Sequence, residues 1–128
     1  MRKTLLSASL FAAAFGLMPV AHAASPAVRF NAIEYQYADS DRVAQAQAAL
    51  GDSIPAGTPL VTAEAVLSDA GARCHVSRHD ANTVQCLYHE MSAADESFDD
   101  IRWTTRLSVS DGAVTAVSVS RYLDRHGN

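Results

Sequence analysis

The chain has two cysteines, Cys74 and Cys86, and they bracket the stretch CHVSRHDANTVQC. A turn centred on Asp80 would place the cysteines opposite each other on antiparallel strands, where their sulfurs are within reach of a disulfide. The central residues, HDAN, are of the kind that connects the strands of a hairpin. The spacing therefore predicts a β-hairpin closed by a Cys74–Cys86 disulfide, which in the chain-entropy model contributes about 3 kcal/mol of stability.

Strand alternation sorts the side chains of this hairpin into two faces. One face is mostly apolar and would point to the core: Cys74, Val76, Val84, Cys86 and Tyr88. The other face is mostly polar and would point to water: His75, Ser77, Thr83, Gln85, Leu87 and His89. Because cysteines and histidines lie on opposite faces, they do not converge on one metal ion. A histidine-only site at His75 and His89 is the alternative, and we expect neither a metal nor a cofactor.

The first 23 residues have the pattern of a secretory signal peptide. Arg2 and Lys3 precede an apolar stretch at residues 5–20, and Ala21-His22-Ala23 offers small residues for cleavage. A membrane anchor is disfavoured, because a spanning helix needs about 20 apolar residues and a proline stands near the end of this stretch. We expect cleavage after Ala23 and a periplasmic or secreted protein, in a compartment that favours the disulfide.

The composition after this leader indicates a single acidic domain at residues 24–128. The chain has ten Lys and Arg against fourteen Asp and Glu, and removing Arg2 and Lys3 leaves eight arginines and a net charge of −6. A chain of this charge repels nucleic acid and anionic lipid surfaces. We therefore expect no nucleic-acid partner and no membrane span after cleavage.

Two segments have the pattern of short helices. The first is SDRVAQAQAALG, with Asp39 or Ser40 as a cap and Gly51 just past its end. The second is GTPLVTAEAVLSDAG, with Thr58 as the N-cap, a proline in the first turn and Gly71 at the end. Residues 27–39 fit either a helix or a strand.

The segment IRWTTRLSV alternates as a strand with one buried face. Its inward residues are Ile101, Trp103, Leu107 and Val109, and its outward residues are Arg102, Thr104, Arg106 and Ser108. A three-residue connection at residues 110–112 would pair Val119 with Trp103 and begin a last strand at about residues 113–122. The sequence predicts an α+β fold: two short N-terminal helices packed on one face of a four-stranded antiparallel meander, with its core at about residues 40–122.

The run PAGTPLVTAEAVLSDAGARC, the second cysteine in the next strand, the tryptophan strand and the DG hairpin resemble the repeat unit of β-lactamase inhibitory protein. They resemble, more loosely, the small outer-membrane assembly lipoproteins of the same helix-helix-sheet fold. The inhibitor has two such units where this chain has room for one, and the lipoproteins have a lipidated cysteine that is absent here. The resemblance implies the fold, and a fold alone does not establish a function.

No motif in the sequence indicates catalysis, and we assign no catalytic residue. Two surfaces suit binding. The first is the open sheet face, which carries His75, His89 and Arg106. The second is the segment EMSAADESFDD at residues 90–100, read as an acidic loop in which Phe98 stands beside Asp99 and Asp100. This loop is either hydrated surface with its phenylalanine folded on the core, or a docking element that uses the aromatic ring as an anchor.

The leading hypothesis is an exported binding module that docks on another exported or envelope protein, as an inhibitor or an accessory. The acidic loop would then favour a partner with a basic patch. The alternative is a small periplasmic enzyme or metal-binding protein that uses the histidine-bearing face of the sheet.

Overall fold

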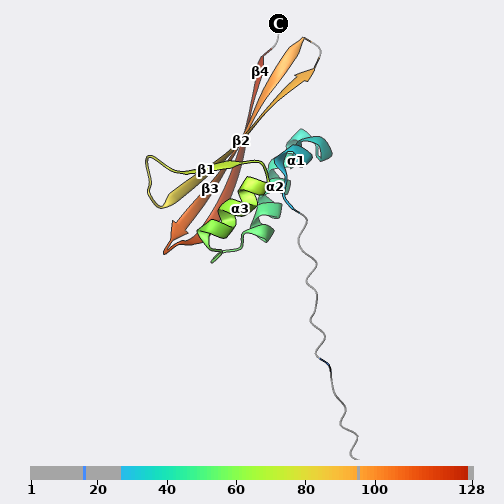
Figure 1. Ribbon diagram of the computed structural model, residues 1–128. Coiled ribbons are helices and arrows are strands. Elements are labelled where there is room, and N and C mark those ends of the chain that lie inside the picture. Colours follow the sequence, from blue (N-terminus) through green and yellow to red (C-terminus); the bar gives the residue numbers. More distant parts are fainter. Residues whose placement is uncertain (1–15, 17–26, 95, 127–128) are drawn as a thin grey trace, which may run out of the picture.

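The computed structural model describes residue 16, residues 27–94 and residues 96–126. Three helices precede four strands (Figure 1): α1 (Phe30–Gln36), α2 (Asp39–Ser53), α3 (Leu60–Asp69), β1 (Arg73–Val76), β2 (Thr83–Ala94), β3 (Ser97–Ser110) and β4 (Ala113–His126). The predicted α+β class is confirmed, since the helices pack against a four-stranded antiparallel sheet. The expected leader, residues 1–23, lies outside the described residues apart from Gly16.

The sheet is a meander in the order β1-β2-β3-β4. Cys74 lies opposite Cys86 and the two form a disulfide, as the alternation of the hairpin predicted. The inward face of β3 is also confirmed, because Ile101, Trp103 and Leu107 are buried.

The segment that was ambiguous in the sequence is the helix α1, so the chain has three helices rather than two. Phe30 and Ile33 are buried on one side of α1, at the spacing of a helical stripe. The ring of Phe30 lies 5.3 Å from that of Tyr88 and 5.3 Å from that of Trp103, measured between centroids. Packing against these two aromatic side chains selects the helix, because a strand would turn Phe30 and Ile33 to opposite faces.

The helix boundaries differ from the prediction at two positions, Gly51 and Thr58. Gly51 lies inside α2, which runs to Ser53 and ends just before Pro55. Pro59 is the N-cap of α3, and the hydroxyl of Thr58 donates to the carbonyl of Pro55 instead of capping the helix. The end of α3 was predicted correctly: Gly71 follows it with a φ of 101°, a left-handed conformation that glycine adopts at low cost.

The cap predicted for α2 is also different. α2 begins at Asp39 after an N-cap at Ala38, and no side chain bonds to the free N–H groups of its first turn. The carboxylate of Asp39 instead forms ion pairs with Arg42 and Arg121. The carboxylate of Asp39 therefore pairs with Arg121 of the sheet instead of capping its own helix.

The register of the β3–β4 hairpin is shifted by two residues from the prediction. The turn has two residues rather than three, Asp111 and Gly112, with φ values of 51° and 73°. The shorter turn shifts the pairing by one residue and an irregularity in the hairpin shifts it by a second, so Trp103 lies opposite Arg121 and not opposite Val119. An irregularity between Ser108 and Val109 restores the inward direction of the valines.

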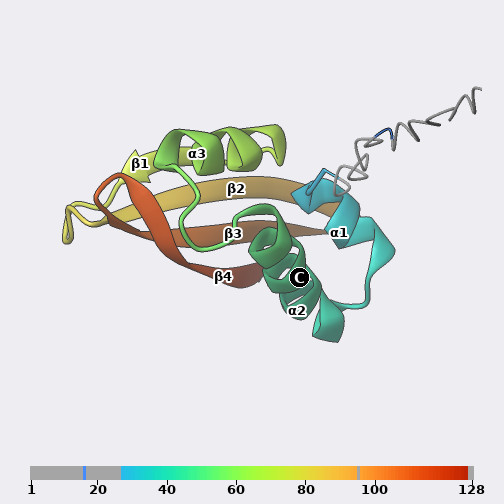
Figure 2. The ribbon, with the colours of Figure 1, turned by 90° about the horizontal axis from the view of Figure 1, so that it is seen from below.

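The predicted acidic loop at residues 90–100 is wrong. β2 continues to Ala94 and β3 begins at Ser97, so this segment is the end of a long hairpin. β4 also extends past the expected residue 122 to His126 and pairs with the same hairpin. Figure 1 shows the three strands extending beyond α1 as an arm, and Figure 2 shows α3 beside β1 and α2 beside β4.

Candidate functional site

The face of the sheet that points away from the helices is defined here as the open face. Strand alternation and the register assign it these residues: Arg73, His75, Gln85, Leu87, His89, Met91, Phe98, Asp100, Arg102, Thr104, Arg106, Ser118, Ser120, Tyr122 and Asp124. Phe98 thus belongs to the same face as the histidines. Phe98 and Asp100 of the second expected surface therefore lie on the same face as the first surface, whereas Asp99 does not.

The predicted site residues fall into three groups on the sheet. Phe98, Asp100 and His89 lie on the open face of the arm, while His75 and Arg106 lie in one row at the other end, on either side of Gln85. Asp99 points to the opposite face of the sheet, 4.0 Å from Arg125. The structure therefore separates Asp99 from its neighbour Asp100.

A hydrogen-bonded network lies at the centre of the open face. Asp100 accepts hydrogen bonds from His89 and, at 2.8 Å, from Nη2 of Arg102. Partial burial by itself would raise the pKa of Asp100, but the hydrogen bonds from Arg102 and His89 outweigh it and hold this pKa below its ordinary value. Asp100 is consequently an ionised and fully paired carboxylate at neutral pH.

Exposed apolar side chains surround this network. Phe98 is 52 % exposed and Tyr122 is 59 % exposed, and Leu87 and Met91 are also exposed. Met91 lies diagonally from Phe98 across the hairpin, and Tyr122 lies directly opposite Arg102. The arm therefore presents aromatic and aliphatic surface around a polar centre.

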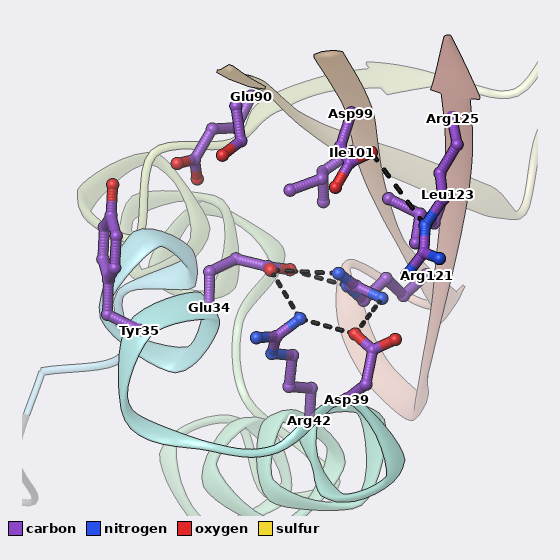
Figure 3. A pocket seen from close by; sticks show the side chains of 11 residues that line it. Glu34, Tyr35, Asp39, Arg42, Glu90, Asp99, Ile101, Arg121, Leu123 and Arg125 are labelled. Carbon is purple, nitrogen blue, oxygen red and sulfur yellow. Dashed lines mark hydrogen bonds and ion pairs between the residues drawn. The ribbon is translucent and has the colours of Figure 1, made fainter. Parts of the chain in front are cut away.

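A cleft of about 510 Å³ lies on the other side of the arm, where the strands extend past α1 and α2 (Figure 3). Charged residues line most of it: Glu34, Asp39, Arg42, Glu90, Asp99, Arg121 and Arg125. Ile101 and Leu123 add apolar surface, and Tyr35 stands at one side.

Glu34 is the centre of the ionic network in this cleft. Its side chain is only 5 % exposed, and that of Arg121 only 8 %. The carboxylate accepts from Nε1 of Trp103 at 2.7 Å and from Nε and Nη2 of Arg121 at 2.6 and 3.0 Å. Nη1 of Arg42 lies 3.2 Å away. A buried carboxylate with this many donors is fully compensated, so the network joins α1 and α2 to the sheet.

The pKa values in the cleft follow from these contacts. The hydrogen bond with Glu34 raises the pKa of Arg121, which stays a cation. Burial raises the pKa of the Tyr88 hydroxyl, and its 2.7 Å hydrogen bond to Glu90 adds to the shift. Arg121 therefore stays charged and Tyr88 stays neutral near neutral pH.

Glu34 and Arg121 did not emerge from the sequence, although two signals were present. Glu34 stands four residues after Phe30 and one after Ile33, on the inward side of a helix. Arg121 stands two residues after the inward-facing Val119, so alternation also turns it inward. A buried tryptophan N–H in addition requires an acceptor, and Glu34 provides it.

The histidines do not come together. His75 lies opposite Gln85, and His89 lies four residues further along β2, which is about 13 Å at the rise of a strand. Within residues 27–94 and 96–126, no group of three or more His, Cys, Asp or Glu side chains is placed to hold a metal ion. Leu87 and Met91 flank His89 on its strand and Arg102 lies opposite, and none of these three offers a nucleophile.

No protein-family model, no curated protein and no solved structure matches the chain. The resemblance to the unit of β-lactamase inhibitory protein therefore stays a prediction. Among the described residues, no helix has the length and apolar character needed to cross a membrane.

Proposed function

We propose that the chain is an exported binding module that docks on another protein through the open face of the arm. The observation that carries the proposal is the group of exposed Phe98, Tyr122, Met91 and Leu87 around an already paired ionic centre. Aromatic side chains and arginine are the residues that protein interfaces favour, and a few buried aromatic anchors supply most of the binding energy.

The charges of the open face favour an acidic partner. Asp100 is paired with Arg102 and His89, and Asp99 lies on the other face near Arg125. Arg73 and Arg106 also lie on the open face, and no ion pair between described residues involves either of them. A partner with acidic side chains beside an apolar patch complements this arrangement, in place of the basic patch suggested by the sequence.

The role of the module is that of an inhibitor or an accessory of an envelope or secreted protein. An inhibitor of this kind needs a rigid surface of aromatic anchors and no catalytic group of its own. The disulfide and the ionic network of Glu34 both hold the sheet in one shape, which limits the entropy lost on binding.

Photocrosslinking in cells tests the proposal. A photoreactive phenylalanine analogue would replace Phe98 or Tyr122 in turn, and Val61, which is 79 % exposed on α3, serves as the control position. We expect one discrete crosslinked protein from both open-face positions and none from Val61. Crosslinks from Val61 alone, or none from Phe98 and Tyr122, would contradict docking through the open face.

A further inference from the structure

The outer edge of β4 is closed along one section by a side chain of α2. Nε2 of Gln47 donates to the carbonyl of Val117 at 2.9 Å, and Oε1 of Gln47 accepts from the N–H of Val119 at 2.9 Å. The carboxamide therefore takes the place that a peptide group of a further strand would occupy. These two bonds also show that the odd-numbered residues of β4 direct their backbone polar groups outward.

The same edge continues without protection along the arm. The register of β4 against β3 is unbroken from Ala116 to His126, so Arg121, Leu123 and Arg125 also direct their N–H and C=O groups outward. The hydrogen bonds of the described residues include none from outside the sheet to these backbone groups. An edge with free peptide groups is a template for one more strand.

We infer that this section of β4, from Arg121 to Arg125, binds an extended segment of the partner protein as a fifth strand of the sheet. The inference rests on the proposed function and specifies how the partner is held. Backbone hydrogen bonds would supply affinity, and alternate side chains of the added segment would supply specificity.

The neighbouring side chains define the chemistry of the segment. Leu123 lines the cleft, so the residue beside it on the added strand is apolar. Arg125 is largely exposed and its nearest carboxylate, Asp99, lies 4.0 Å away, so the residue beside it is acidic. The segment thus alternates an acidic and an apolar residue on its cleft side, in agreement with an acidic partner for the open face.

A second copy of the chain fits this edge less well. Antiparallel pairing of two β4 strands about Leu123 would place Arg121 of one copy beside Arg125 of the other. Like charges directly opposite each other destabilise a strand pair, which favours a segment of a different protein.

The test compares Leu123→Pro with the matched control Leu123→Ala. Both remove the leucine side chain, but only proline removes the outward N–H, and the ladder between β3 and β4 keeps its bonds. The probe is the most enriched peptide from a phage library of random 12-residue peptides, selected on the purified protein. We expect at least tenfold weaker peptide binding to Leu123→Pro than to Leu123→Ala, and slower amide exchange at Arg121, Leu123 and Arg125 when peptide is bound.

Each other outcome overturns the inference. These outcomes are no enriched peptide, equal binding by the two variants, amide protection confined to other residues, or a concentration-dependent dimer joined through β4. If Leu123→Pro does not fold, the inference is tested by the amide exchange of the unmodified protein with and without bound peptide. Docking that still depends on Phe98 while the β4 edge binds nothing would refute strand addition and leave the proposed function intact.

Discussion

Replacing Glu34 with glutamine would remove the charge at the centre of the cleft network and keep the size of the side chain. The oxygen that accepts from Trp103 at 2.7 Å is retained, but Arg121 loses its closest anionic partner. Breaking a buried ion pair from one side costs about 3–5 kcal/mol, because the remaining charge stays buried. Asp39 still lies 3.1 Å from Arg121, so we expect a loss of about 3 kcal/mol, at the lower end of that range.

Urea denaturation of the variant measures this loss as a change in the free energy of unfolding. The matched control is Glu96→Gln, an exposed glutamate in the β2–β3 turn, whose replacement should change stability by less than about 0.5 kcal/mol. Joint replacement of Glu34 by glutamine and Arg121 by methionine should recover much of the stability, since the amide oxygen still accepts from Trp103 and no buried charge is left unpaired. If Glu34→Gln and Glu96→Gln had equal effects, the network would not be what fixes α1 to the sheet.

Three further changes test the rest of the fold. Cys86→Ser should lower the free energy of unfolding by about 2–5 kcal/mol, and adding reductant should lower that of the unmodified protein similarly. The folded pKa of Asp100 lies below its ordinary value, so its stabilising effect is complete above about pH 4 and is lost as the pH falls further. The free energy of unfolding, measured with urea between pH 3 and pH 5, should therefore fall less with acid in Asp100→Asn than in the unmodified protein. An identical fall in both proteins would contradict the pairing. Gln47→Glu removes the donor to Val117 and should cost about 1–3 kcal/mol, whereas Gln45→Glu, on the exposed side of the same helix, should cost little by the same measurement.

The parts of the fold that follow from the alternation of side chains along a β-strand were predictable from the sequence. The Cys74–Cys86 pairing followed from alternation and a short connection, and the inward direction of Trp103 followed from alternation alone. These predictions need only local geometry, because a single-residue slip would turn every apolar side chain of the strand to water.

The cleft network depended on a register that the sequence left open. A two-residue turn at Asp111 and Gly112 and the irregularity between Ser108 and Val109 each moved the β3–β4 pairing by one position, and together they brought Arg121, not Val119, opposite Trp103. A shift of two residues preserves the direction of every side chain, so the hydrophobic pattern could not reveal it. The position of Arg121 beside Glu34 is a consequence of this turn and this irregularity together.

The sequence predicts a loop where the structure has the arm, because the acidic residues show no partner within their own strand. A run of acids is usually hydrated surface, but Asp100 is bound by His89 from β2 and Asp99 lies near Arg125 of β4. Cross-strand pairing supplies cations to Asp99 and Asp100, and only the assembled sheet shows this.

The most direct measurement of docking through the open face is the affinity of the crosslinked partner for Phe98→Ala, with Val61→Ala as the control. Phe98 is half exposed and lies outside the buried core, so Phe98→Ala should lower the free energy of unfolding far less than the loss of a core aromatic would. Docking through the open face predicts a loss of at least about 2 kcal/mol in binding, roughly thirtyfold in Kd, for Phe98→Ala and no loss for Val61→Ala. An unchanged Kd for Phe98→Ala, or a larger loss at Val61 than at Phe98, would contradict it.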